Sequence, residues 1–194
     1  KGMGTTLDVV LYDGTLERGE EIAFLTQKGV ERAKVRALLE PNFSGKSPQE
    51  KYLNLEKVVA AAGVKISAPN LEGAIPGSPF TGISDFEVQK AEMEKHFKSV
   101  LVNSEHDGVI IKADSLGSVE ALICLFKKHS IPIKRTGIGP ITRKDVLESR
   151  AVSERDRYKG ALFGFEVKVM EDAQEEADNS GATLICNNVI YKLI

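Results

Sequence analysis

The sequence predicts a mixed fold, in which an N-terminal antiparallel β-barrel is followed by an α/β/α sandwich with a four-stranded parallel sheet. Two observations predict it. Residues 5–39 alternate between apolar and polar positions and break at turn residues, which is typical of antiparallel strands. After Ser84, short Ile- and Val-rich runs alternate with segments of helical spacing, the pattern of a parallel sheet covered by helices. We therefore predict a first domain over residues 1–84 and a second over 85–187.

The composition is that of an ordinary globular protein. The 194 residues carry 26 basic and 28 acidic side chains, a net charge of −2, so the overall charge predicts neither nucleic-acid nor membrane binding. No apolar run approaches the ~20 residues of a membrane-spanning helix, and we expect no signal peptide. Cys124 and Cys186 stand in separate apolar runs and are predicted to be unpaired core thiols. We expect a cytoplasmic protein that does not contact membranes.

Five strands are predicted in the first domain. Three of them follow one another across short turns, and Asp13-Gly14 is predicted to close a hairpin between the first two. The apolar runs of these three strands read TLDVVLY, EIAFLT and VERAKVRALL. A polar excursion begins after Pro41, and LNLEKVVAAAG is predicted to form a helix that ends at Gly63. The last two strands are predicted in VKISAP and SPFTGI.

The second domain is predicted to begin with a helix. Ser84 and Glu87 have the spacing of a capping box, with Ser84 as the N-cap. Four strands follow, in the runs GVIIKA, IPIKRTG, ALFGFEVKV and ATLICN. The helices between and after them are predicted over residues 116–129, 142–152 and 171–180. A further helix is predicted to begin in residues 188–194.

Two glycine-containing segments invite a nucleotide-binding interpretation. Gly45-Lys46-Ser47 resembles the end of a phosphate-binding loop, but Glu40 stands where that motif needs a glycine. Pro48 then follows where the motif needs a helix, so we predict a surface loop. Residues 114–118 read DSLGS between a strand and a helix, with one glycine where a dinucleotide site has three. There Ser115 or Ser118 is predicted to cap the helix.

Residues 137–145 are predicted to be a turn and a helix start, with Thr142 as the N-cap and Asp145 three residues later. An alternative function remains for both segments. In a small-molecule-binding α/β domain or enzyme, the ligand would occupy the strand carboxyl ends near residues 114–118 and 137–139. Against it, no Ser, Cys or His has an evident base beside it, so the sequence offers no catalytic, nucleotide-binding or metal-binding residue.

One charged pattern suggests a partner. The period of a strand places Arg32, Lys34 and Arg36 on one face, with Lys28 nearby. A row of cations on the outside of a barrel can follow an RNA phosphate backbone. Charges on an edge strand also prevent aggregation, and the two interpretations stay open. These four residues are the candidate rRNA contacts.

Several segments resemble archaeal and eukaryotic translation initiation factor 5B, which is related to bacterial initiation factor two. Three segments resemble the second domain of that factor, and they read GMGTTLDVVLYDG, RALLEP and AAAGVKI. Four more resemble its third domain, and they read KADSLGSVEAL, GIGP, KDV and DAQE. NVIYKL is similar to the start of the long helix that follows in the factor. The matches run in order through nearly the whole chain.

The resemblance implies a middle fragment of a ribosome-dependent GTPase that promotes subunit joining. Residues 1–84 would form an elongation-factor-like second domain whose first strand is missing, 85–187 the sandwich, and 188–194 the start of a linker helix. GTP and Mg²⁺ would bind a domain outside this sequence, and initiator tRNA would bind only the missing C-terminal barrel. We therefore expect no cofactor and no catalysis in the fragment. Its expected role is to contact small-subunit rRNA through the barrel, as a monomer, and to couple the flanking domains.

Overall fold

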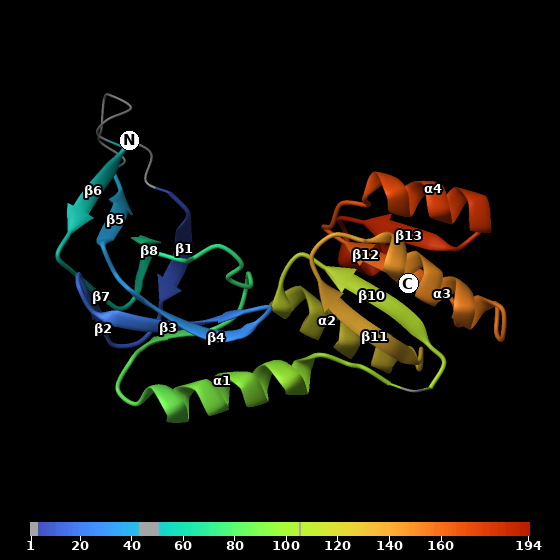
Figure 1. The fold of residues 1–194 in the computed structure, drawn as a ribbon, viewed down its shortest axis with the longest axis horizontal. Coiled ribbons are helices and arrows are strands. Elements are labelled where there is room, and N and C mark those ends of the chain that lie inside the picture. The colour runs from blue at the N-terminus through green and yellow to red at the C-terminus, as the bar shows by residue number, and fades with distance from the viewer. Residues whose placement is uncertain (1–3, 43–50, 105) are drawn as a thin grey trace. The chain divides into compact units, whose positions relative to one another are not determined.

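The computed structural model describes residues 4–42, 51–104 and 106–194 (Figure 1). The chain forms two compact units. The first comprises the described residues up to Ala74 together with Pro79–Glu94, and the second comprises Ile75–Ser78 together with the described residues from Lys95 onward. Gly45-Lys46-Ser47, predicted to be a surface loop, lies outside the described residues.

The first unit is built from antiparallel strands, as predicted. They pair in the orders β1-β8-β5-β6, β4-β3-β9 and β2-β7. Their bounds are β1 Thr6–Leu11, β2 Thr15–Glu17, β3 Glu21–Thr26, β4 Gly29–Lys34, β5 Ala37–Pro41, β6 Tyr52–Leu55, β7 Lys57–Val59, β8 Ala62–Ser67 and β9 Phe80–Gly82.

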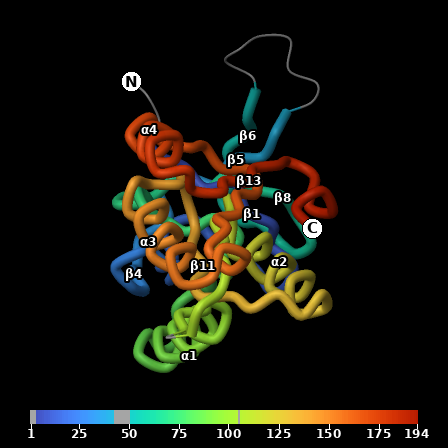
Figure 2. Tube along the Cα trace, turned by 90° about the vertical axis from the view of Figure 1, so that its right-hand side faces the viewer, coloured from blue at the N-terminus to red at the C-terminus, as the bar shows by residue number. Residues whose placement is uncertain are grey.

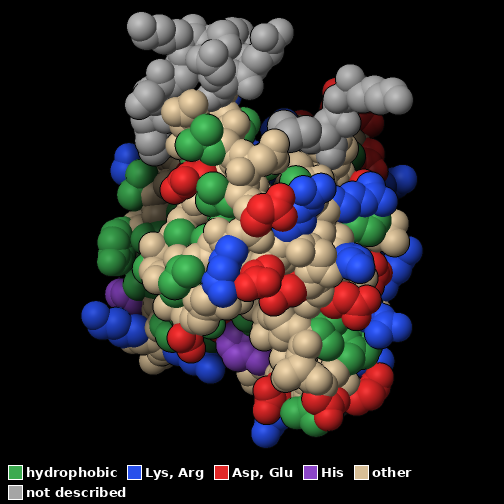
Figure 3. Space-filling model, turned by 90° about the vertical axis from the view of Figure 1, so that its left-hand side faces the viewer, with side chains coloured by type: hydrophobic (Ala, Val, Ile, Leu, Met, Phe, Trp, Pro, Cys, Tyr) green, Lys and Arg blue, Asp and Glu red, His purple; other side chains and the backbone are tan. Residues whose placement is uncertain are grey.

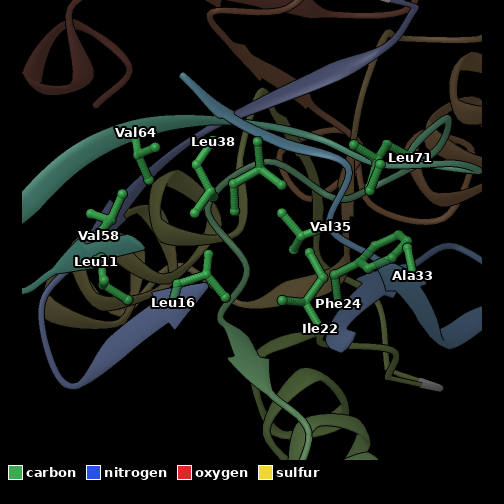
Figure 4. Packing of buried hydrophobic residues seen from close by; sticks show 12 residues of the cluster. Leu11, Leu16, Ile22, Phe24, Ala33, Val35, Leu38, Val58, Val64 and Leu71 are labelled. Carbon is green, nitrogen blue, oxygen red and sulfur yellow. The ribbon is translucent and has the colours of Figure 1, made fainter. Parts of the chain in front are cut away.

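The core of this unit lies between the sheets (Figure 4). Leu16, Ile22 and Leu38 are almost wholly buried and come from three different sheets. Burying each such side chain contributes about 1.5–3 kcal/mol. Ile22 and Phe24 share one face of β3 because side chains alternate along a strand. The same alternation places Ala33 in this core from β4.

Two predictions in this unit are wrong. The segment LNLEKVVAAAG forms β6, β7 and the start of β8, where we predicted a helix. Its apolar residues follow the strand period, since Val58 is buried while Val59 is exposed. Asp13-Gly14 does turn the chain, but it closes no hairpin, because β1 pairs with β8 and β2 pairs with β7. A hairpin does join β3 to β4, where Thr26 pairs with Gly29.

The parallel sheet of the second unit is confirmed. Its strands are β10 (Val109–Ala113), β11 (Ile133–Ile138), β12 (Leu162–Phe165) and β13 (Leu184–Asn187), in the order β11-β10-β12-β13. The helices are α2 (Leu116–Lys128), α3 (Arg143–Ser153) and α4 (Glu171–Ser180). Figure 2 shows α2 on one side of this sheet and α3 and α4 on the other. Two apolar clusters accordingly cover its two faces.

The helix α1 (Phe86–Val100) contributes its first half to the first unit and its second half to the second. Asp85, where we predicted Ser84, caps it: the Asp85 Oδ1 atom accepts hydrogen bonds from the N–H groups of Glu87 (3.2 Å) and Val88 (3.3 Å). Asp85 lies one residue nearer the helix, so its shorter reach to the first turn favours it.

Three further features bear on the predictions. The segment after residue 188 forms only a short 3₁₀ helix, Ile190–Lys192. Cys124 and Cys186 are unpaired, as predicted, but exposed rather than in the core. No helix in the described part of the chain is long and apolar enough to cross a membrane.

Candidate nucleic-acid interface

The predicted alternation of β4 is present, and its cations differ in their surroundings. Arg32, Lys34 and Arg36 are exposed, while Ala33 and Val35 between them are buried. Because β4 is the edge strand of its sheet, protection against aggregation remains an explanation for these charges. The individual surroundings of the cations distinguish them further.

Arg32 lies against α1. Its guanidinium carbon stands 5.4 Å from the centroid of the Phe86 ring, a cation–π contact worth about 0.5–1 kcal/mol at an exposed site. Leu25 and Val30 share this side of the β3–β4 hairpin and are buried, although they lie outside the barrel core. The Glu94 carboxylate approaches the hairpin at Gly29, where a Cβ would lie 3.7 Å from Glu94 Oε1. Arg32 therefore helps to hold α1 on the outer face of the hairpin.

Lys34 and Arg36 line a groove of about 640 Å³ on the same unit, which we call the cationic groove; its other lining residues are Arg18, Gly19, Val35, Glu56 and Pro69. The β2–β3 loop and the β4–β5 connection form it. They are joined by two backbone hydrogen bonds, from Gly19 N to Val35 O (2.9 Å) and from Val35 N to Glu20 O (2.8 Å).

Arg18 is fixed within the cationic groove. Its Nε donates to the carbonyl oxygen of Arg36 (2.9 Å), and its terminal nitrogen pairs with Glu56 Oε1 (2.9 Å). Lys34 and Arg36 have no side-chain ion pair with any described residue. The groove therefore holds three cations against one carboxylate, which favours an anion. Sequence reasoning missed Arg18 because it lies on another strand connection, far from the Arg32–Arg36 row along the chain.

Charge is mixed elsewhere on the first unit. The face drawn in Figure 3 carries Lys and Arg interspersed with Asp and Glu. On this unit Lys57 pairs across strands with Glu17 (2.8 Å) and Lys65 with Asp8 (2.5 Å). Any attraction for an anion therefore depends on local geometry rather than on a broad positive field.

The N-terminus of α2, which the alternative function needs, is occupied by the unit's own chain. The Ser115 hydroxyl accepts from Ser118 N (3.3 Å), which confirms the predicted cap. Leu116 N donates to the carbonyl oxygen of Pro76 (3.0 Å). Gly77 lies so close that a Cβ there would stand 3.4 Å from Gly117 N. The backbone donors that would bind a phosphate are covered by residues 75–78.

A buried charged network fills the space beside residues 137–139. The Asp145 carboxylate, on a residue that is 3% exposed, accepts from Arg135 and from the backbone and hydroxyl of Thr142 (2.8 and 2.7 Å). The Lys112 Nζ atom lies 3.7 Å from it, and Arg135 also bonds Glu148 (2.8 Å). Thr142 is thus the N-cap of α3, as predicted.

Burial and the hydrogen bonds of this network shift the pKa values of its members in identifiable directions. Burial lowers the pKa of Lys112, and the nearby Asp145 only partly offsets it. Burial alone would raise the pKa of Asp145, but the hydrogen bonds from Arg135 and Thr142 outweigh it and leave that pKa lowered. Two cations and two carboxylates neutralise one another here. Among the described residues, no group of three or more His, Cys, Asp or Glu side chains is placed to hold a metal ion.

Comparison with known proteins identifies the family. Residues 84–194, more than half of the chain, match the family model described as translation-initiation factor 2. The chain belongs to the translation initiation factor 2 family. This confirms the resemblance drawn from the sequence.

Relatives of this translation initiation factor 2 chain are found among archaeal proteins. It is 42% identical to the probable translation initiation factor IF-2 of Thermococcus kodakarensis and 39% identical to that of Saccharolobus solfataricus. Each match covers the whole chain, but only 17% and 32% of those proteins. The crystal structure of GDP-bound aIF5B from Aeropyrum pernix matches with a TM-score of 0.85 and 34% identity, over the whole chain and 33% of that protein. The chain thus spans a third or less of these relatives.

Proposed function

We propose that this chain is the ribosome-contacting and conformational-coupling part of a translation initiation GTPase that promotes subunit joining. Membership of the translation initiation factor 2 family supports a role in translation initiation. The cationic groove supports the contact: it would bind the phosphate backbone of small-subunit rRNA. The unpaired side chains of Lys34 and Arg36 beside the fixed Arg18 are the observation that carries this proposal.

The chemistry fits a backbone contact better than base recognition. Cations that replace condensed counterions bind phosphates without reading sequence. Three engaged cations give a slope of log affinity against log salt of about −2 on single strands. No aromatic side chain lines the groove, so bases gain no stacking partner in it. The fragment alone therefore binds weakly and loses affinity steeply with salt.

The other activities of the parent protein belong, in this proposal, to segments outside the sequence. GTP and Mg²⁺ bind the GTPase domain, initiator tRNA binds a C-terminal barrel, and this chain performs no catalysis. Because α1 has residues in both compact units, it is one element through which movement of one unit would reach the other.

Co-sedimentation with purified small ribosomal subunits tests the groove. The Lys34→Ala/Arg36→Ala variant removes two groove cations that have no ion-pair partner, so its fold is expected to be unchanged. Binding should weaken, and the salt slope should become shallower by about 1.4. The matched control is Lys28→Ala, which removes an exposed cation outside the groove and should bind as the parent chain does.

The unfolding temperatures of both variants should be measured as well, because an unchanged value excludes a loss of structure as the cause of weaker binding. Equal binding by the groove variant and the parent chain would contradict the proposal. An equal loss in both variants would mean that the whole β4 edge, and not the groove, contacts the ribosome.

A further inference from the structure

Tyr158 lies in the loop that joins α3 to β12, and its side chain is exposed to solvent. It is 91% exposed, the most exposed of the large apolar and aromatic side chains for which exposure is described. Tyrosine normally buries its ring against other side chains. A ring exposed to water contributes little to the stability of the fold, so stability does not explain why an aromatic side chain occupies this position.

The loop is anchored at both ends. At its start, the N–H groups of Arg155 and Asp156 donate to the Val152 carbonyl oxygen (3.0 and 2.9 Å), which continues the last turn of α3. At its end, the carbonyl oxygen of Gly160 accepts from the Ser153 hydroxyl (3.2 Å). Gly160 packs so closely that a Cβ there would stand 1.8 Å from Ser153 Oγ. Both ends of the loop are therefore bonded to the last turn of α3.

Asp156 accepts hydrogen bonds and forms an ion pair within the turn that contains Tyr158. Its Oδ1 accepts from Tyr158 N (3.1 Å), its Oδ2 pairs with Lys159 Nζ (3.0 Å), and its carbonyl oxygen accepts from Lys159 N (3.1 Å). These bonds fix the backbone on both sides of Tyr158 and leave its side chain free. The backbone that carries the ring is thus held by the loop's own bonds, so less backbone entropy is lost on binding.

The charges around the ring favour an anionic partner. Three carboxylates lie in or beside the loop, and each has a cationic partner: Asp107 pairs with Arg155 (2.6 Å), Glu154 with Arg150 (3.3 Å) and Asp156 with Lys159 (3.0 Å). Arg157, directly before Tyr158, is exposed and has no ion pair with any described residue. The loop presents one aromatic ring beside one unpaired guanidinium, and no second exposed apolar side chain that a protein partner would cover.

We propose that Tyr158 and Arg157 form a contact for an unpaired RNA nucleotide, whose base stacks on the ring while its phosphate binds the guanidinium. Unstacked RNA bases are bound in this way by aromatic rings and arginine side chains. The contact lies on the second unit and is distinct from the cationic groove. It rests on the proposed function for the identity of the RNA, but the contact itself can be measured with a plain oligonucleotide.

The sequence contains no tryptophan, so Tyr158→Trp introduces a single fluorophore that keeps a stacking ring. Titration with unstructured oligouridylate and oligoadenylate should quench its fluorescence in a saturable way. The matched control is Tyr12→Trp: Tyr12 is also 79% exposed, but it precedes Asp13 rather than a cation. The control should show no saturable quenching.

Two further variants test the assignment of roles. Stacking of one base contributes enough binding free energy that Tyr158→Ala should weaken oligonucleotide binding at least about fivefold. Tyr158→Phe keeps the ring and should bind as the parent chain does. Arg157→Ala in the Tyr158→Trp background should weaken the quenching and reduce its salt dependence.

Equal quenching in the two tryptophan variants, or unchanged binding by Tyr158→Ala, would overturn the inference. Loss of ribosome binding by Tyr158→Ala without loss of oligonucleotide binding would overturn it in favour of a protein partner. Adding Lys34→Ala/Arg36→Ala to the Tyr158→Trp chain should leave the quenching intact. If the quenching disappears, the signal reports the cationic groove, and the inference fails while the proposed function stands.

Discussion

Asp145→Asn is expected to destabilise the second unit far more than this nearly isosteric change suggests. The Asp145 carboxylate accepts hydrogen bonds from Arg135 and from two donors of Thr142, and it faces the buried Lys112. An asparagine keeps the shape but removes the charge, which leaves two partly buried cations without their common partner. Breaking a buried ion pair in this way costs about 3–5 kcal/mol, a large share of the about 5–15 kcal/mol that stabilises a typical domain.

Two variants in the same network provide the controls. Glu148→Gln removes a carboxylate that is about a quarter exposed and that pairs with Arg135 alone among the described residues, so it should cost about 1 kcal/mol or less. Lys112→Met removes the buried cation, whose charge burial disfavours, while Asp145 keeps Arg135 and Thr142. Its cost should therefore be far smaller than that of Asp145→Asn.

Native-state hydrogen exchange is the suitable assay, because each unit has a core of its own and a global transition would mix them. Amides of β10, β11 and α3 should lose protection in Asp145→Asn, while amides of β3 and β5 keep theirs. A cost below about 1 kcal/mol, or equal costs for Asp145→Asn and Lys112→Met, would refute the view that this carboxylate organises the network.

Three further predictions concern the cap of α1, the titration of Asp145 and the binding of GTP. Asp85→Ala should destabilise the chain by about 1 kcal/mol in thermal unfolding and Ser84→Ala by much less, since Asp85 caps α1; the reverse order would restore Ser84 as the cap. The pKa of Asp145 is lowered in the folded state, so its stabilisation is complete above its unfolded pKa of about 3.9 and is lost as the pH falls through the lower folded value. The acid limb of a pH–stability profile should therefore flatten in Asp145→Asn, and an unchanged limb would contradict this. Finally, GTP should give no binding heat in calorimetry, because the sequence has no complete phosphate-binding loop; micromolar affinity that Lys46→Ala abolishes would disprove it.

The sequence was most informative where one period governs a whole element. Residues 116–129 were predicted as a helix and form α2 over Leu116–Lys128, because its apolar stripe and its Ser115 cap are both local. The segment from Leu53 to Gly63 misled because it forms strands too short to establish a period. Its conformation depends on partners far along the chain, such as Glu17 opposite Lys57, which no local pattern records.

The candidate site shows the same limit at the level of single residues. Alternation correctly predicted that Arg32, Lys34 and Arg36 are exposed, but it could not say what else lies on that side of the strand. Arg32 makes a cation–π contact with Phe86 of α1. The third cation of the cationic groove is Arg18, which comes from the β2–β3 loop.

Two neighbouring cations of β4, Arg32 and Lys34, make contacts with different parts of the molecule. Arg32 holds the first turns of α1, and Lys34, two residues later, lines the cationic groove. Because successive residues of a strand move together, an anion that orders Lys34 and Arg36 would also restrict the backbone that positions Arg32. Binding in the groove and the seating of α1 therefore act on the same stretch of backbone. We propose that this shared stretch couples an anion bound in the groove to α1, which has residues in both units.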